Sequence, residues 1–382
     1  MTDAVIVAAA RTPIGRARKG SLVDVDAFEL AQVAVSGAID RSGVPVSDLD
    51  DIVIAESLQG GGVIARNIAV RMGLSHVPGL ADNRHCAAGL SAVQIASGSI
   101  RAGMDRVVVA GGTESLSSMP QVLKSVPASA GEFKPWMSES HPDTPEAPAF
   151  DMALTVGENT ARIGGVTREA ADEWAFHSHQ RAARSVASGW FEAEIVPVGD
   201  FAVDEHPRAD TTIEKLASLP VLHPELPNPI VTAGNAAGLN DAAAAVVVTS
   251  DDYAAANGLQ PLARIISWAS IGIEPERTGL APTLAIPKAL ERAGMKIGDI
   301  DLFEINEAFC SMAVASSRAL GLDHDIVNVN GSGCGLGHPI AATGARMVVT
   351  MIHELRRRDA SVGVVSMCAG GGMGSALVLE IL

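Results

Sequence analysis

The chain has 382 residues, of which 47% are hydrophobic and only 3% are aromatic, and it contains 38 glycines. This length predicts two or three structural units, and the composition favours a core of closely packed small aliphatic side chains over a disordered or fibrous chain. The formal net charge of −16 argues against nucleic-acid binding, because the surplus of Lys and Arg that neutralises phosphates is absent.

The four cysteines, Cys86, Cys310, Cys334 and Cys368, form no CxxC pair. This spacing predicts neither a metal site nor a disulfide scaffold and is typical of a reducing compartment. Near the N-terminus, Asp3 stands where a secretory signal would carry positive charge. No apolar run approaches the roughly 18 residues of a membrane helix, so we expect a cytoplasmic protein without membrane partners.

Apolar runs of strand length alternate with Ala-rich helical stretches in the first third of the chain. Buried strands are predicted at 5–10, 51–57 and 105–112, and helices at 25–42 and 88–102. The alternation is typical of βαβ units. It predicts an α/β fold with a mainly parallel sheet covered by helices.

The segment 116–235 has a different composition, rich in Pro, Ser, His and charged residues. These residues favour loops. One helix is predicted within it at 168–189, with Thr167 as its N-cap and Gly189 at its end. We interpret the segment as a loop-rich insertion over the core.

The chain also resembles itself at an offset of about 250 residues. VSDLDDIVIAESLQ at 46–59 resembles IGDIDLFEINEAFC at 297–310, and RVVVAGGTES at 106–115 resembles VGVVSMCAGGGMG at 362–374. Repetition at this spacing predicts two related halves. The expected units are an N-terminal half of 1–115 plus 236–262, the insertion 116–235, and a C-terminal half of 263–382.

The same offset relates Cys86 to His338, which lie 252 positions apart. If a pseudo-twofold axis relates the halves, these two residues occupy equivalent helix starts and come together.

Cys86 lies in NRHCAAGLSAVQ, residues 83–94. A single cysteine is often a small buried hydrophobe. Here, however, Asp82 and Asn83 are candidate helix caps, which would place Cys86 near a helix N-terminus, where oriented N–H groups lower a thiol pKa. The small side chains at 87–89 leave room for a substrate.

His338 follows alternating glycines in NGSGCGLGHPIAATGAR, residues 330–346. Pro339 fixes φ at the expected first helical position, so the histidine is either presented by a rigid turn or is a satisfied structural residue. The glycine spacing is not GxGxxG, which excludes a dinucleotide fingerprint.

Two further stretches carry candidate groups. Cys368 ends an apolar run before a glycine stretch that includes Gly370, whose backbone N–H groups can point at an oxyanion, although such a run can also be a simple tight turn. Asn306 and Glu307 follow another strand, at the end where sites in parallel sheets lie.

Together these motifs resemble the thiolases, the family of acetyl-CoA acetyltransferases and 3-ketoacyl-CoA thiolases. The resemblance spans nearly the whole chain, in the family's order. The related β-ketoacyl synthases use a second histidine where this chain has Cys368, which favours thiolase. The matching motifs are RTPIG (11–15), the Cys86 segment, VVVAGGTESLS (107–117), EIVPV (194–198), TAGNAAGLNDAAAA (232–245), NEAF (306–309), GHP with the TGAR helix (337–346) and CAGGGMG (368–374).

The resemblance implies the thiolase fold, two similar α/β halves in five αβαβα layers, with 116–235 as a CoA-binding loop domain. It implies that Cys86 is the nucleophile and acyl carrier, that His338 takes its proton, and that Cys368 is the second acid/base. It also implies two oxyanion sites, one using His338 and a water held by Asn306, the other using the backbone N–H groups of Cys86 and Gly370.

For CoA, the resemblance places Arg208 near the nucleotide, although a solvated surface arginine fits equally well. Ala237 replaces the serine of TAGNASG in biosynthetic members, so a hydroxyl contact is lost. The stretch DMALTVGEN (151–159) lacks the histidine of their substrate loop, and NGSG (330–333) is of the degradative type. These departures favour the degradative branch that serves fatty-acid β-oxidation.

We therefore expect thiolytic cleavage of a 3-ketoacyl-CoA to acetyl-CoA and a shortened acyl-CoA, with CoA and acyl-CoA as substrates and no permanently bound cofactor. The alternatives are condensation of two acetyl-CoA molecules and, in another class, a non-catalytic acyl-CoA or lipid-binding relative. The last alternative should lack one of Cys86, His338 and Cys368, all of which are present. The family further implies a homodimer or homotetramer.

Overall fold

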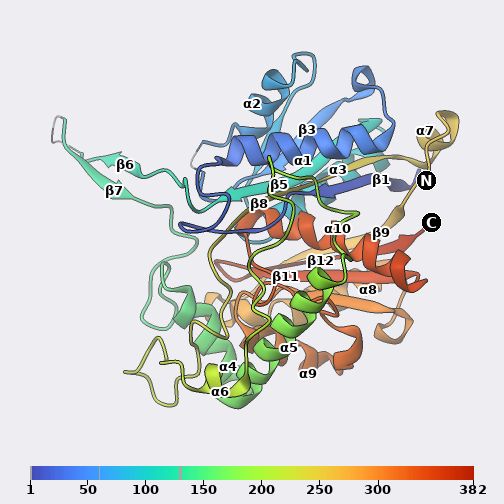
Figure 1. Ribbon diagram of the computed structural model, residues 1–382. Coiled ribbons are helices and arrows are strands. Elements are labelled where there is room, and N and C mark those ends of the chain that lie inside the picture. The colour runs from blue at the N-terminus through green and yellow to red at the C-terminus, as the bar shows by residue number, and fades with distance from the viewer. Residues whose placement is uncertain (1, 60, 128, 130) are drawn as a thin grey trace.

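The computed structural model describes all residues except 1, 60, 128 and 130. Its main sheet has ten strands, with β10-β11-β12-β9-β1-β8-β5-β3-β4 in spatial order and β2 beside β8. A separate hairpin of β6 (Val122–Ser125) and β7 (Phe133–Trp136) projects from the body (Figure 1). The main strands are β1 (Ala4–Arg11), β2 (Gly15–Arg16), β3 (Asp51–Ala55), β4 (Leu80–Asp82), β5 (Val107–Ser115), β8 (Asn240–Ser250), β9 (Ala263–Gly272), β10 (Leu302–Ile305), β11 (Val362–Ala369) and β12 (Met373–Ile381).

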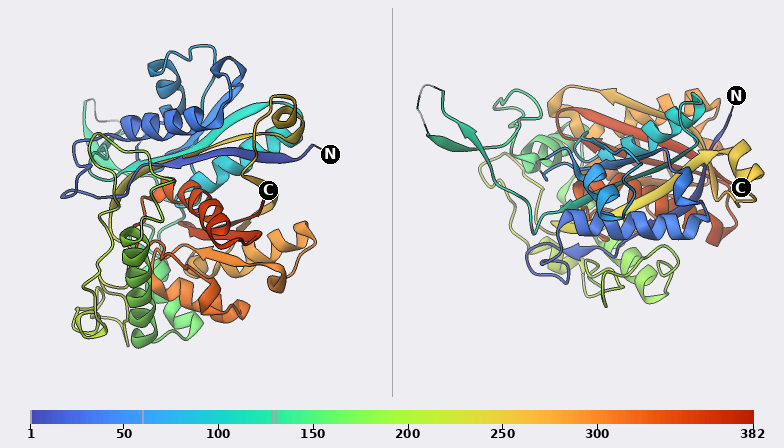
Figure 2. Two further views of the ribbon diagram at one scale, coloured as in Figure 1. Left: turned by 45° about the vertical axis from the view of Figure 1, so that its right-hand side comes forward. Right: turned by 90° about the horizontal axis from the view of Figure 1, so that it is seen from above.

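The helices form three layers that alternate with the two halves of this sheet (Figures 1 and 2). Helices α1 and α2 cover one outer face, α8 and α9 cover the other, and α3 and α10 lie between the halves. Their bounds are α1 (Ala27–Ser42), α2 (Ile64–Arg71), α3 (Ala88–Arg101), α4 (Asn159–Gly164), α5 (Arg168–Ala187), α6 (Ile213–Ala217), α7 (Asp251–Ala256), α8 (Pro282–Ala293), α9 (Cys310–Leu320) and α10 (Ile340–Arg358).

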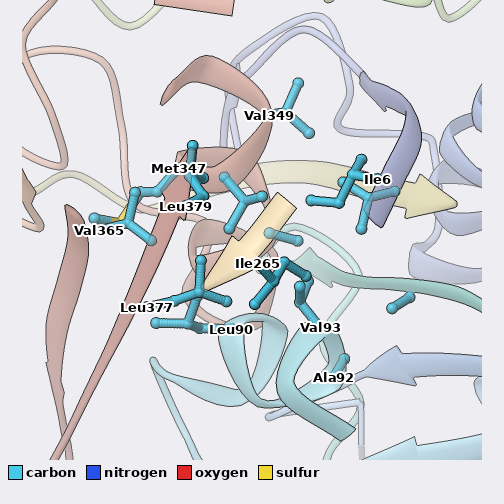
Figure 3. Packing of buried hydrophobic residues seen from close by; sticks show 14 of the residues in the cluster. Ile6, Leu90, Ala92, Val93, Ile265, Met347, Val349, Val365, Leu377 and Leu379 are labelled. Atoms are coloured by element: carbon cyan, nitrogen blue, oxygen red, sulfur yellow. The ribbon is translucent and has the colours of Figure 1, made fainter. Parts of the chain in front are cut away.

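Helices on both faces of the sheet explain why β5 and β11 are buried along their whole length. Figure 3 shows side chains of α3 and α10, such as Leu90 and Met347, in one cluster with Ile6 of the first half and Leu377 of the second. The five-layer arrangement expected from the sequence is confirmed.

The expectation of a mainly parallel sheet is wrong. The ladders β3–β4, β3–β5 and β10–β11 are parallel, whereas β1–β8, β1–β9, β5–β8, β9–β12 and β11–β12 are antiparallel. The reason lies in the connections. Strands β11 and β12 are joined by the short glycine turn at 370–372, and such a short link can only reverse the chain.

The internal repeat is visible in the structure. Strands β3 and β5 of the first half and β10 and β11 of the second form equivalent parallel pairs. Helix α3 precedes β5 and begins at Ala88, and helix α10 precedes β11 and begins at Ile340. These starts keep the offset that relates Cys86 to His338, so each of these residues stands two positions before a central helix.

The segment 116–235 contains the helix predicted from its caps. In α5, the Thr167 side chain accepts a hydrogen bond from the backbone N–H of Ala170, and Gly189 adopts a φ of 68° just beyond the end. Nowhere in the described chain is there a helix with the length and apolar character needed to cross a membrane.

Candidate active site

The starts of the two central helices pack directly on each other. A β-carbon added to Gly89 of α3 would lie 2.4 Å from the carbonyl oxygen of Ala341 in α10. A β-carbon on Gly344 would lie 2.3 Å from the backbone nitrogen of Leu90. Only glycine permits this approach, which places the segments carrying Cys86 and His338 side by side.

The turn before α3 differs from the one expected. Asp82 ends β4, and Asn83 does not cap the helix: its side-chain oxygen accepts a 2.8 Å hydrogen bond from the N–H of His85. His85 has a φ of 46°, and α3 begins at Ala88 without a side-chain cap. Cys86 therefore lies in a tight turn outside the helix.

The pKa of Cys86 is also opposite to the expectation. Burial raises the pKa of its thiol to about 11, although the backbone N–H groups of Gly370 and of Cys86 itself favour the thiolate. Desolvation outweighs these N–H groups, so the resting group is a thiol. The backbone N–H groups of Gly370 and of Cys86 nevertheless place two hydrogen-bond donors at the Cys86 sulfur.

Cys368 lies at the end of β11, facing the same region. It is buried, and its sulfur lies 3.5 Å from the Met312 sulfur. Burial, together with the negative charge that Cys86 carries when it is ionised, raises the pKa of Cys368 far above the ordinary range. An ionised Cys86 therefore opposes ionisation of Cys368, so that two negative charges here are unfavourable.

His338 is a neutral imidazole. Burial and the positive charge of Arg346 lower its pKa to about 3. Its Nδ1 lies 2.7 Å from the Thr343 hydroxyl, and its backbone N–H donates to the Asn240 side-chain oxygen at 3.0 Å. A neutral ring can accept a proton, whereas a cationic ring cannot.

Asn306 adjoins this ring. Its side-chain nitrogen lies 3.4 Å from Nε2 of His338, and its side-chain oxygen is buried without a partner among the described residues. The neighbouring Glu307 is held by Trp174 and Ser178, at 2.8 and 2.6 Å, which fixes the loop after β10.

The structure brings one of the two expected CoA-binding residues close to these groups. The Ala237 backbone N–H donates to the carbonyl oxygen of Ala308 at 3.0 Å, two residues after Asn306. Arg208 is exposed, and no contact joins its side chain to the reacting groups in the described structure.

Sequence analysis missed the residues that hold His338. Thr343 lies in the TGAR stretch, and its place five residues after His338, on the adjoining helix turn, was the available signal. Asn240 is in turn contacted by the buried ring of His206, whose Nδ1 lies 3.1 Å from its side-chain nitrogen. Nothing local in the sequence connects residues so far apart.

Cys310 and Cys334 are both buried. The Cys334 thiol contacts the carbonyl oxygens of Gly234 and Ala236 at 3.5 and 3.8 Å, and the Cys310 backbone N–H donates to Asn235. No cluster of three or more His, Cys, Asp or Glu suited to a metal occurs in the part of the chain that the structure describes.

Chemically, the site combines a half-buried thiol with two N–H donors, a second thiol, and a neutral imidazole beside an amide. This set can form a thioester, stabilise an oxyanion and move protons, which is what acyl transfer requires.

Comparison with known proteins also indicates an acyltransferase. The family model for the N-terminal domain of thiolase matches residues 4–252, and that for the C-terminal domain matches residues 259–381. An acetyl-CoA acetyltransferase of Escherichia coli (strain K12) and a 3-ketoacyl-CoA thiolase of Bacillus subtilis (strain 168) are each 39% identical, over the full length of both chains.

Solved structures agree. The acetyl-CoA acetyltransferase of Bacillus anthracis has a TM-score of 0.92 at 40% identity, covering 100% of this chain and 99% of that one. The human mitochondrial 3-ketoacyl-CoA thiolase in complex with CoA also has a TM-score of 0.92, at 34% identity, covering 100% of this chain and 98% of that one. The chain therefore belongs to the thiolase family, has its fold, and is an acyltransferase of the thiolase class.

Proposed function

We propose that the protein cleaves a 3-ketoacyl-CoA with CoA, through an acyl group carried on Cys86. The observation that carries the proposal is the grouping of two thiols, Cys86 and Cys368, with the Gly370 N–H and the neutral ring of His338. Two thiols and one neutral base suit a reaction in which a proton must be removed and returned twice.

In the first half-reaction, His338 takes the Cys86 proton and the sulfur attacks the 3-keto carbon. The bond between C2 and C3 breaks, and Cys368 protonates C2, so acetyl-CoA leaves. In the second half-reaction, the Cys368 thiolate takes the proton of CoA, and the CoA sulfur attacks the thioester. Cys86 leaves as a thiolate and regains its proton from His338.

The oxyanions would lie in two places. The backbone N–H groups of Cys86 and Gly370 face one, and His338 with a water on Asn306 faces the other. The unpartnered buried oxygen of Asn306 supports a polar occupant beside it.

CoA would enter from the segment 116–235, which we assign as the CoA-binding loop domain between an N-terminal half (1–115 with 236–262) and a C-terminal half (263–382). Ala237 would line the pantetheine path, and Arg208, exposed on an otherwise acidic protein, would meet the nucleotide phosphates. The protein would act in the cytoplasm as a homodimer or homotetramer.

Intact-protein mass spectrometry after mixing with acetyl-CoA tests the carrier. We expect one acetyl adduct on Cys86, lost in Cys86→Ala. An unmodified wild-type protein would favour a non-catalytic acyl-CoA-binding relative and would refute the mechanism.

Condensation of two acetyl-CoA molecules is the second candidate, because relatives such as those of E. coli and B. anthracis are named acetyl-CoA acetyltransferases. A comparison of kcat/KM for acetoacetyl-CoA with kcat/KM for longer 3-ketoacyl-CoAs distinguishes condensation from degradative cleavage. A strong preference for acetoacetyl-CoA would contradict the degradative assignment.

A further inference from the structure

The loop 331–337, which ends directly before His338, has few side chains of its own to hold it in place. Four of its seven residues are glycines. Helix α5 packs closely on this loop, because a β-carbon on Gly335 would lie 2.4 Å from the carbonyl oxygen of Ser178. Groups from other parts of the chain must therefore determine where the loop, and with it the histidine, lies.

Three backbone N–H groups of the loop donate to two side chains from other elements. Ser332 and Gly335 donate to the hydroxyl oxygen of Ser178, at 3.3 and 3.0 Å. Cys334 donates to Oε2 of Glu307 at 3.1 Å. The Ser178 hydroxyl in turn donates to the same Oε2 at 2.6 Å. One hydroxyl on α5 and one carboxylate oxygen after β10 thus hold the loop together.

The partners of the Glu307 carboxyl group among the described residues are four donors. Its Oε1 accepts from side-chain N–H groups of Trp174 at 2.8 Å and Asn328 at 2.7 Å, and its Oε2 accepts from Ser178 and Cys334. This arrangement suits a carboxylate, which only accepts hydrogen bonds. Both Glu307 and Ser178 are buried, and in such a place an unpaired polar group is costly.

The same loop connects the two groups that face the expected oxyanion. A β-carbon on Gly333 would lie 2.6 Å from the side-chain oxygen of Asn306, which directly precedes Glu307 in the chain. The side-chain nitrogen of Asn306 lies 3.4 Å from Nε2 of His338. A shift of the loop would change this distance. Misplacing a reacting group by about 1 Å can lower a rate on the order of 100-fold.

We propose that Ser178 and Glu307 are positioning residues, which hold the loop 331–337 and thereby fix His338 relative to Asn306. Because Ser178 belongs to α5, the segment 116–235 then sets the geometry of proton transfer in addition to the CoA-binding role proposed above. The inference rests on the proposed function, in which His338 takes the proton of the nucleophile.

Ser178→Ala is the first test, because it removes the hydroxyl that two loop N–H groups and Glu307 share. The measurement is the rate constant for acetylation of Cys86 by acetyl-CoA, followed by quenched-flow mass spectrometry of the intact protein. We expect this rate constant to fall at least about tenfold. The final level should stay at one adduct per chain, and KM for acetoacetyl-CoA should change by less than about twofold, because no substrate contact is lost.

The matched control is Ser97→Ala. Ser97 is a buried serine in α3, and its hydroxyl donates only within its own helix, to the carbonyl oxygen of Val93 at 2.6 Å. The control should keep the wild-type rate constant.

Three results for Ser178→Ala would each overturn the proposal. An unchanged rate constant would show that the hydroxyl does not position the ring. A lower final level of adduct, formed with the wild-type rate constant, would show only a loss of folded protein. A higher KM with an unchanged rate constant would show a role in binding CoA instead.

Glu307→Gln tests whether the two residues act as one unit. The amide keeps the size of the side chain but turns an N–H group toward two of the four donors, so the rate constant should again fall at least about tenfold. If both residues act through the same loop, adding Ser178→Ala should lower it by less than about threefold more. Multiplication of the two single effects would overturn the shared role. If Glu307→Gln does not fold, Ser178→Ala alone decides.

Failure of this inference and failure of the proposed function give different results. If wild-type protein and Ser178→Ala are acetylated on Cys86 equally fast, only the positioning role is wrong. If the wild-type protein is not acetylated at all, the proposed function is refuted, and the positioning role with it.

Discussion

Gly89 and Gly344 hold the first turns of α3 and α10 in contact, each leaving room for the backbone of the other helix. Because Cys86 and His338 stand two residues before these turns, this contact sets the spacing of the reacting segments. The internal repeat therefore explains how the site is assembled. The starts of two equivalent helices bring a thiol, that of Cys86, and an imidazole, that of His338, to the same region.

Gly89→Ala tests this contact. The added β-carbon would lie 2.4 Å from a backbone oxygen that cannot swing away, so the helices must separate. We expect a loss of about 1–3 kcal/mol in unfolding free energy and a lower kcat. The control is Gly98→Ala on the same helix, where the nearest atom, Cζ2 of Trp268, is 3.8 Å away. That change should leave stability equal or slightly higher, because alanine favours helices. Equal effects at both positions in urea unfolding would contradict the role of the contact.

Sequence patterns predicted much of this fold because buried strands and amphipathic helices carry their own periodicity. The strands near 5–10, 51–57 and 105–112, the helix α5 with its Thr167 cap, and the offset relating Cys86 to His338 were all visible. The relative direction of neighbouring strands could not be predicted, because an apolar sequence that is fully buried in a sheet has the same pattern in parallel and antiparallel pairs.

The site was predicted less completely, for a different reason. Residue types and the family resemblance pointed to Cys86, His338 and Cys368, but the sign of the Cys86 pKa shift depends on burial, which local sequence does not report. Likewise, Asn83 closes a turn instead of capping a helix, and Thr343 and Asn240 reach His338 only after the chain has folded.

Thr343→Val tests the support of His338. The change removes the hydroxyl 2.7 Å from Nδ1 but keeps the shape of the side chain, so the ring loses its fixed orientation. A lost hydrogen bond of about 1–1.5 kcal/mol corresponds to roughly a tenfold lower kcat, with KM nearly unchanged. Thr343→Ser keeps the hydroxyl and should retain most of the activity. If the serine variant is as slow as the valine variant, packing of the methyl group, not the hydrogen bond, matters.

The alkylation rate of Cys86 reports its ionisation in the resting protein. Of the four cysteines, Cys86 alone is not buried, so iodoacetamide should modify it first. With a thiol pKa of about 11, the thiolate fraction, and hence the rate, should rise about tenfold per pH unit from pH 7 to pH 10. Mass spectrometry of the adduct measures this rate, with Cys86→Ser as the blank. A plateau below pH 9 would show that the N–H groups at Gly370 and Cys86 outweigh burial.

Buried histidines predict how the fold responds to acid. Burial is the main cause that lowers the pKa of His206 and His338 to about 3 and that of His353 to about 4. In the unfolded chain these rings titrate near 6.5, so the unfolded state binds more protons below that pH. Their contribution to stability is complete above pH 6.5 and is lost as the pH falls toward 3–4, by about 1.4 kcal/mol per pH unit for each ring.

His353→Gln isolates one of these rings, because glutamine stays neutral and His353 lies outside the reacting groups. Urea unfolding at pH 7.5, 6.5, 5.5 and 4.5 should show a pH dependence shallower by about one proton in this variant. His76→Gln, at an exposed histidine, should leave the slope as in the wild-type protein. If His353→Gln shows the wild-type slope between pH 6 and 4.5, then His353 titrates alike in both states, and its burial does not keep it neutral.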